Sequence, residues 1–195
     1  EHRKNMRSVL EPIMKFKEYP EGMLVLHEEC ASLAQKYDIP SQFLYAINPK
    51  TMALLVKLYE RDGHINREEL ELGDNTHEIL DGADNIVVIL DYDDKKVYYF
   101  NTISNTAVIG TNATYTQVVV GIFSALSVLI FDELKPGAYF PEDLFDTCYR
   151  HFMFDNLRVQ EFVFEKQDSG HLKLSSFNPM IKNRQTESYR HLYII

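Results

Sequence analysis

The sequence predicts an α+β fold, in which helices pack on a sheet, and three observations support this class. The chain has 195 residues, of which 45% are hydrophobic and 25% are charged, as in an ordinary globular protein with its own core. Segments with strand and helix patterns alternate without the regular repeat of a doubly wound sheet. The 8 glycines never cluster, so neither glycine-rich nucleotide-binding motif is present.

Two strands and two helices are expected in the first third of the chain, after an irregular or partly helical entry. In order, these are a strand over 23–26, a helix over 31–37, a strand over 42–47 and a helix that starts at Asn48-Pro49 and ends at Gly63. Pro40 disfavours helical backbone in the residue before it, which ends the first helix near Asp38. Asparagine is a suitable N-cap and proline suits the first helical position, which favours the start of the second helix.

The rest of the chain predicts a hairpin, two helices and a last strand. These are strands over 86–90 and 97–100, a buried helix from Thr111 or Asn112 to about Asp132, a helix from Pro141 to about Met153 and a strand over 159–164. The acidic segment 91–96 joins the two hairpin strands. Residues 166–195 carry few signals, and we expect a polar tail there.

Composition restricts the partners and the location of the chain. The net charge of −9 disfavours nucleic acid and favours cations, small polyamines among them. Cys30 and Cys148 lack metal-ligand spacing and suit a reducing, cytoplasmic setting. No secretory signal precedes the first strand, and the longest apolar run, 118–131, is 14 residues, which is too short to span a membrane. Since the sequence begins at Glu1 rather than Met, we expect a fragment of a longer protein or a shortened form.

The most informative motif is His27-Glu28-Glu29, which precedes a helix and follows four apolar residues that we expect to form a buried strand. Open α/β sheets bind ligands at such strand ends. A histidine beside carboxylates suits proton transfer on a cationic substrate. A structural interpretation is also open: a hydrogen-bonded histidine at a strand end, followed by two glutamates that stabilise the first turn of a helix.

Other groups of polar or ionisable residues do not indicate a functional site. His77 and Asp81 have the spacing of a metal pair on a helix, but Gly82 interrupts the helix and no third ligand is indicated, so we predict no metal site. The acidic residues of segment 91–96 are expected at a solvated hairpin tip, because the pattern of a calcium loop is missing. Cys148 lies in an aromatic-rich helical segment and is expected to be buried rather than nucleophilic.

Three segments together resemble the homospermidine synthases, of the saccharopine-dehydrogenase-like family. Residues 27–34 (HEECASLA) are similar to the family's His-x-Glu motif before a helix. Residues 80–84 (LDGAD) are similar to its Val-Asp-Gly-Ala-Asp segment, and residues 111–118 (TNATYTQV) to its Asn-Ala-Thr-x-x-Gln-Val segment before a buried helix. The segments appear in family order, and the resemblance covers roughly residues 24–163.

The resemblance implies an NAD-dependent transferase of polyamine biosynthesis. In such enzymes hydride leaves the carbon beside a putrescine amine, ammonia is lost from the imine, a second diamine condenses, and the same NADH reduces the new Schiff base. It implies catalytic or substrate-orienting roles for His27 and Glu29, an ammonium contact for Asp84, and a cofactor contact for Asn112 or Thr114. Glu28 departs from the small residue expected between the histidine and the glutamate, and either adds an amine contact or marks a changed pocket.

The family's N-terminal dinucleotide (Rossmann) domain has no counterpart in this chain. We therefore expect residues 1–110 to form the substrate and catalytic region, residues 111–165 to pack on the absent domain, and residues 166–195 to form a tail. The resemblance also implies a cytoplasmic homodimer that acts on putrescine or spermidine. Two alternatives stay open: a non-catalytic relative that dimerises or binds polyamines, and a related amino-acid reductase.

Overall fold

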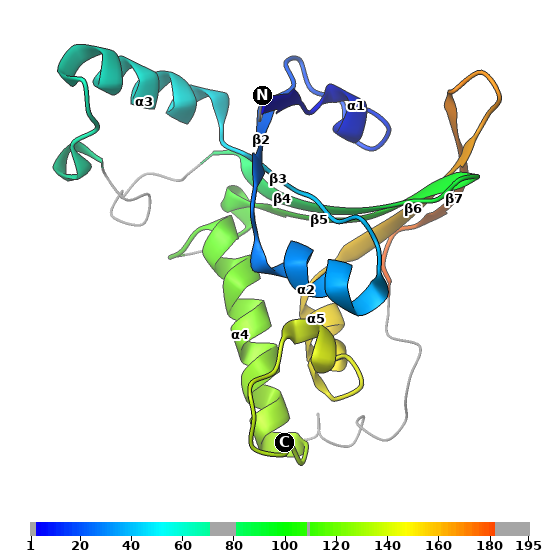
Figure 1. Ribbon diagram of the computed structural model, residues 1–195. Coiled ribbons are helices and arrows are strands. Elements are labelled where there is room, and N and C mark those ends of the chain that lie inside the picture. Colours follow the sequence, from blue (N-terminus) through cyan, green and yellow to red (C-terminus); the bar gives the residue numbers. More distant parts are fainter. Residues whose placement is uncertain (1–2, 71–80, 109, 182–195) are drawn as a thin grey trace. The chain divides into compact units, whose positions relative to one another are not determined.

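The computed structural model describes residues 3–70, 81–108 and 110–181 (Figure 1). The chain divides into two compact units, Glu1–Glu71 and Leu72–Ile195, called unit 1 and unit 2 below. Each unit contains one antiparallel sheet and several helices. The α+β class predicted from the sequence is therefore confirmed.

Unit 1 is built on a three-stranded antiparallel sheet with the order β1-β2-β3. Its elements are β1 (Arg3–Asn5), α1 (Arg7–Leu10), β2 (Glu21–Val25), α2 (Glu28–Tyr37), β3 (Phe43–Ala46), α3 (Pro49–Asp62) and a short 3-10 turn at Arg67–Glu69. Both expected strands and both expected helices are present. The expectation that the strand before His27 is buried is wrong, because most of β2 is exposed and Leu26, just beyond it, is 93% exposed.

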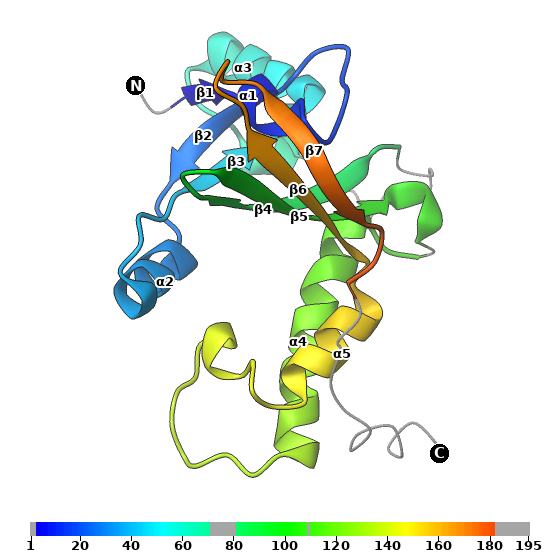
Figure 2. The ribbon, with the colours of Figure 1, turned by 90° about the vertical axis from the view of Figure 1, so that its right-hand side faces the viewer.

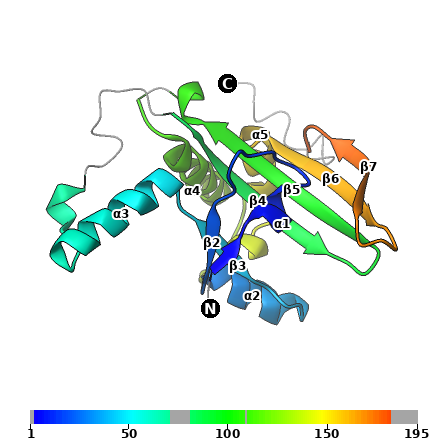
Figure 3. The same cartoon turned by 90° about the horizontal axis from the view of Figure 1, so that it is seen from above.

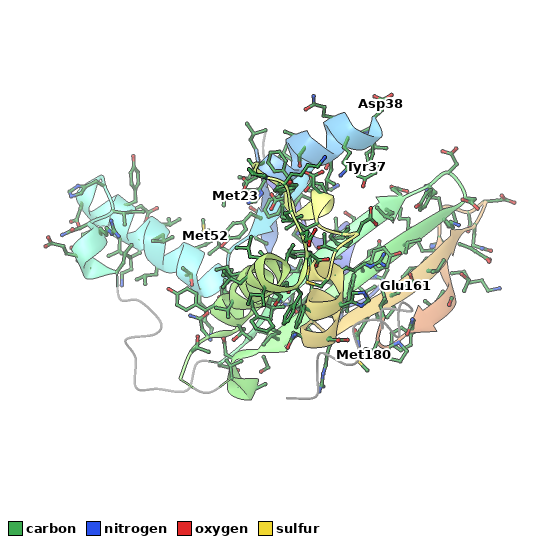
Figure 4. The ribbon with its side chains drawn as sticks, turned by 90° about the horizontal axis from the view of Figure 1, so that it is seen from below. Met23, Tyr37, Asp38, Met52, Glu161 and Met180 are labelled. Carbon is green, nitrogen blue, oxygen red and sulfur yellow. The ribbon has the colours of Figure 1, made fainter. Side chains whose placement is uncertain are left out.

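Helix α3 begins and ends where local chemistry predicts, whereas α2 begins at Glu28, three residues before the expected start. The side chain of Asn48 accepts a hydrogen bond from the N–H of Lys50 at 2.9 Å, and Gly63 ends α3 with φ of 71°. Asp38 ends α2 in the same left-handed region, with φ of 53°. Tyr37 and Asp38 lie together at this end of α2 (Figure 4). The predicted capping of α3 is confirmed.

Unit 2 is built on a four-stranded antiparallel sheet with the order β4-β5-β6-β7 (Figure 3). Its elements are β4 (Ala83–Asp91), β5 (Lys95–Ser104), α4 (Ala113–Phe131), α5 (Tyr149–Asn156), β6 (Val159–Lys166) and β7 (Leu172–Asn178), with 3-10 turns at Asn105–Ala107 and Pro141–Asp143. The predicted hairpin is β4–β5, and its strands are longer than expected. The predicted last strand is β6.

Two features of unit 2 differ from expectation. The helix expected from Pro141 to about Met153 is a single 3-10 turn followed by α5, which begins only at Tyr149. Just before α5, the N–H of Cys148 donates to the Asp132 carboxylate at 2.8 Å. Strand β7 lies in the expected tail. Ser175 is the extra residue of a bulge in β7, which breaks the alternation of apolar residues that would have predicted a strand.

Helices α4 and α5 lie on the same side of the sheet of unit 2 and pack on each other (Figure 2). Val128 of α4 forms a core cluster with Leu144, Cys148 and Tyr149. At the other end of α4, Gln117 donates to the Asn101 side chain on β5 at 2.6 Å. These contacts fix which face of α4 is turned inward.

Apart from Val128, the buried residues of α4 are small or polar, whereas its outward face is apolar. The buried residues include Gln117, Ser124 and Ser127, and each serine donates its hydroxyl hydrogen to the carbonyl four residues earlier. Seven apolar side chains share the opposite, exposed face, and we call them the outer face of α4: Tyr115, Val118, Val119, Ile122, Leu126, Leu129 and Ile130. The prediction of a buried helix is therefore wrong for this face.

The length of α4 also bears on the membrane prediction. With 19 residues it is longer than the apolar run visible in the sequence, and in the described part of the chain it is long and apolar enough to cross a membrane. This follows from length and composition only, and a core helix of a soluble protein passes the same test. The predicted absence of a membrane partner and the cytoplasmic location stay predictions.

Candidate functional site

His27 lies in unit 1 between β2 and α2, where the extended chain turns into a helix. It is the N-cap of α2, with extended backbone (φ −121°, ψ 146°), and its carbonyl accepts the N–H of Cys30 at 3.1 Å. Glu28 and Glu29 form the first turn of α2. Carboxylates at this position are favoured by the partial positive charge of a helix N-terminus. The strand-to-helix boundary therefore places three ionisable groups together.

The rule that open α/β sheets bind ligands at the ends of their strands does not apply to this motif. It concerns parallel sheets, in which the carboxyl ends of strands meet at one edge. The sheet of unit 1 is wholly antiparallel. Evidence for a functional site at His27 must therefore come from the contacts that these side chains make.

The imidazole of His27 is held on two sides. Its Nδ1 contacts a carboxylate oxygen of Glu29 and lies 3.4 Å from a carboxylate oxygen of Glu28. Its ring stacks on Phe43 of β3, with centroids 4.5 Å apart and planes 21° apart. The carboxylates and the aromatic ring together fix the orientation of the imidazole.

These contacts determine which nitrogen of His27 can exchange a proton. An ionised carboxylate only accepts hydrogen bonds, so the Nδ1 that contacts Glu29 carries the hydrogen. In the neutral ring Nε2 then holds the lone pair and acts as the base. The His27 side chain is 35% exposed, so solvent and ligands reach it. The arrangement can therefore take a proton from, or return it to, a bound amine.

A cation is the ligand that this cluster favours. Ligand atoms of His27, Glu28 and Glu29 lie within 4.8 Å of one another. The glutamate side chains are 72% and 46% exposed, so each keeps oxygen atoms available for a further partner. An ammonium group and a divalent metal ion would both meet these charges. The predicted absence of a metal stays a prediction.

Asp84, the predicted ammonium partner, lies in unit 2 near the start of β4. It is paired with Ile103 of β5 and is half-buried. The structure thus describes it within a different unit from His27. Its substrate contact stays a prediction.

Asn112 has a clear structural role at the head of α4. Its side-chain oxygen accepts the N–H of Tyr115 at 2.9 Å, and its carbonyl accepts the N–H of Thr116. The N–H of Ala113 donates to the side chain of Asn105 at 2.8 Å. Because these N–H groups already have acceptors, this helix start is not a prepared phosphate site. A cofactor contact by Asn112 or by the exposed Thr114 stays a prediction.

Two of three smaller predictions can be compared with the structure. Cys148 is fully buried, and burial together with the nearby Asp132 carboxylate raises the pKa of its thiol to about 12, which confirms a core residue rather than a nucleophile. Asp91 lies at the end of the β4–β5 hairpin, 2.7 Å from Lys166 Nζ and 2.8 Å from Lys96 Nζ. His77 lies outside the described residues, so the His77–Asp81 pair stays a prediction.

Two residues of the site were not identified from the sequence. Phe43 and Tyr45 lie on one face of β3, and their rings are nearly parallel, with centroids 6.5 Å apart and planes 15° apart. Their spacing of two residues in a predicted strand already indicates a shared face. The stacking of Phe43 on His27 depends on the pairing of β2 with β3, which the sequence does not specify.

Comparisons with known proteins add no assignment. No protein-family model matches the chain, and neither a curated protein nor a solved structure matches it. The function is therefore argued from the site and from the resemblance of the three segments.

Proposed function

We propose that this chain is the substrate-binding and catalytic portion of an NAD-dependent homospermidine synthase-like enzyme. In this role it joins aminobutyl groups from putrescine or spermidine through imine intermediates. The observation that supports it most strongly is the His27 imidazole, held by the Glu29 carboxylate and the Phe43 ring. A histidine of fixed tautomer beside two carboxylates matches a reaction on ammonium groups.

The chemistry of the cluster follows from its charges. Glu28 and Glu29 attract and orient an ammonium group, and their attraction for it strengthens when a bound substrate displaces water. Nε2 of His27 accepts a proton from that ammonium, because only a neutral amine is converted to an imine or attacks one. The imidazolium formed in this step is stabilised by the Glu29 carboxylate at Nδ1.

NAD must be held by residues outside this chain. Bound NAD would supply the hydride acceptor, but the chain has no glycine-rich phosphate loop, and the N–H groups of Ala113 and Tyr115 at the start of α4 already have acceptors. In this proposal the outer face of α4 packs on the missing dinucleotide domain. A row of apolar side chains with no charged residue is typical of a surface covered in the complete protein.

The test uses the full-length protein, identified by a strand followed by G-x-G-x-x-G upstream of Glu1. His27→Ala or Glu29→Gln should reduce kcat by orders of magnitude while NAD stays bound, as measured by equilibrium dialysis. His64→Ala is a matched control, since His64 is exposed and makes a hydrogen bond only within its own turn. Near-normal turnover in both site variants would remove the assignment.

A second experiment tests the role of α4. Ile122→Glu in the full-length protein should abolish turnover and weaken NAD binding, because it places a charge in the proposed domain interface. Leu174→Glu on β7 makes the same chemical change at a similar exposure, 50% against 55%, and should have little effect. Residues 1–195 alone should show no turnover. Homospermidine formed by residues 1–195 alone would contradict the role given to the missing domain.

The alternatives give different results in the same assays. A non-catalytic polyamine-binding relative would bind putrescine through the same carboxylates, yet show no turnover even as the full-length protein. An amino-acid reductase would bind amino acids in preference to putrescine and spermidine. Calorimetry with these three classes of ligand separates the possibilities.

A further inference from the structure

We propose that β4 is an interface between two copies of this protein, in which the two β4 strands pair antiparallel about Val87 and join their sheets into one. This inference goes beyond the proposed function and does not depend on its reaction. Strands β4 and β7 are the outer strands of the sheet of unit 2 (Figure 3). An outer strand presents a row of N–H and C=O groups with which a further strand can pair.

The two outer strands differ in their protection against such pairing. Strand β7 carries Lys173 and the bulge at Ser175, and both features discourage the addition of a strand. Strand β4 has nine residues, contains no lysine or proline, and pairs with β5 in an unbroken register. Its middle, residues 85–90 (NIVVIL), carries no charge. These are the features of a strand that is paired on both edges in the complete assembly.

Hydrogen bonds at the two ends of the β4–β5 hairpin show which groups of β4 point outward. The N–H of Tyr92 donates to the carbonyl of Lys95 at 2.9 Å, and the N–H of Asn105 donates to the carbonyl of Gly82 at 3.0 Å. Antiparallel bonding alternates, so the even-numbered residues of β4 bond to β5 and the odd-numbered residues turn their N–H and C=O groups outward. In the described part of the chain, no other strand pairs with these outward groups.

A second copy of β4 fits this edge because the strand is complementary to itself. With Val87 on a two-fold axis, the whole of β4 overlaps its counterpart, and each outward group meets an outward group of the partner. Ile86 then lies opposite the partner's Val88, in the kind of pair whose side chains approach most closely. Ile86 is 48% exposed and Val88 is 52% exposed, so the pairing buries aliphatic side chains that are otherwise in water.

The charges of β4 are compatible with this register. Asp84 lies opposite the partner's Leu90 and Asp91 lies opposite the partner's Ala83, so no two carboxylates face each other. A shift by one residue would set Asp84 against Asp91, but it would also set outward groups against inward ones and lose the hydrogen bonds. Asp91 is in addition paired with Lys166 Nζ at 2.7 Å. Hydrogen bonding, apolar contact and charge therefore agree on one arrangement.

Disulfide cross-linking of the full-length protein, with Cys30→Ser in every variant, tests the register. Val87→Cys places two thiols across the two-fold axis with Cα atoms about 5.5 Å apart, a separation that a disulfide can bridge. Ile89→Cys is the matched control, since both residues are half-buried on one face of β4 but the two copies of residue 89 lie about 13 Å apart. Mild oxidation should link Val87→Cys into dimers and leave Ile89→Cys unlinked. Equal linking of the two variants would overturn the inference.

Sedimentation equilibrium tests the association without a cross-link. Val88→Lys should raise the dimer Kd about tenfold or more, since it removes the aliphatic pairs on both sides of the axis and places a charge between the strands. Leu174→Lys on β7 makes the same kind of change at a similar exposure, 50% against 52%, and should leave the Kd unchanged. Circular dichroism confirms that each variant is folded.

Three results of these measurements would overturn the inference. The first is a wild-type protein that stays monomeric. The second is a dimer that Ile122→Glu on α4 dissociates and Val88→Lys does not, which would place the interface on the outer face of α4. The third is a disulfide that Val87→Cys forms in residues 1–195 alone but not in the full-length protein, which would show that the missing domain covers β4.

Discussion

The orientation of α4 gives a sharp prediction, because the same substitution can be made on its two faces. Val128 is fully buried in the cluster around Cys148, whereas Val119 is 58% exposed on the outer face. Val128→Ala removes buried methyl groups worth about 1.6 kcal/mol in transfer free energy, at about 0.8 kcal/mol per group. A cavity adds to this cost, so we expect a total loss of about 2–3 kcal/mol.

Val119→Ala should change stability little. It removes methyl groups that are already in contact with solvent, and alanine has a helix propensity up to about 0.7 kcal/mol better than that of valine. The expected change in the free energy of unfolding is within about 0.5 kcal/mol of zero. The two variants differ in position only, so helix propensity contributes equally to both and cancels in their comparison.

The assay uses Cys148 as a reporter of the core. Its thiol is buried and its pKa is raised, so a thiol reagent should react with it only after unit 2 opens. Cys30→Ser removes the other thiol from the assay. Val128→Ala should accelerate labelling roughly 30-fold to 100-fold, since each 1.4 kcal/mol corresponds to a factor of ten. Equal acceleration by Val119→Ala would refute the orientation of α4, and urea unfolding gives an independent measure of both changes.

Two further predictions concern pH. Lys166, and then Lys96, lower the pKa of Asp91, so this carboxylate stabilises the fold above the ordinary aspartate pKa and loses its effect as pH falls through the lowered value. Asp91→Asn should cost about 0.5 kcal/mol at pH 7, because the pairs are exposed, and the cost should vanish in acid when urea unfolding is followed from pH 7 to pH 2. Burial, and then the charge of Arg150, lower the pKa of His151, so the unfolded chain binds its proton more readily and stability should fall as pH drops below about 6.5. His151→Gln should reduce that fall in thermal unfolding between pH 7 and pH 5, and an unchanged profile would show that another group is responsible.

The sequence predicted elements well where a local rule decides them. Asn48 and Asn112 cap their helices as expected, since a cap depends on a few neighbouring residues. The β4–β5 hairpin was predictable for the same reason. Strand β7 was missed because the bulge at Ser175 shifts its alternation by one residue. A shift of register depends on the strand with which β7 pairs, and the local sequence pattern of β7 carries no information about that strand.

In the candidate site, too, the proximity of sequence neighbours could be predicted, whereas contacts between strands could not. Adjacent positions in the sequence already place His27 beside Glu28 and Glu29. The stacking of His27 on Phe43 depends on antiparallel pairing across 16 residues of chain, so it could not be inferred from a local pattern. Asp84 lies in unit 2, and its contact with a substrate stays a prediction.

The two faces of α4 differ in polarity in an unusual way. Helix α4 buries Val128 in the core of unit 2, but it also turns Gln117, Ser124 and Ser127 inward, and most of its aliphatic residues point outward. The serines tolerate burial because their hydroxyls donate to carbonyls of the same helix. The aliphatic residues gain free energy only when another surface covers them. A surface that covers the outer face of α4 would bury these side chains, and in our proposal that surface belongs to the NAD-binding domain.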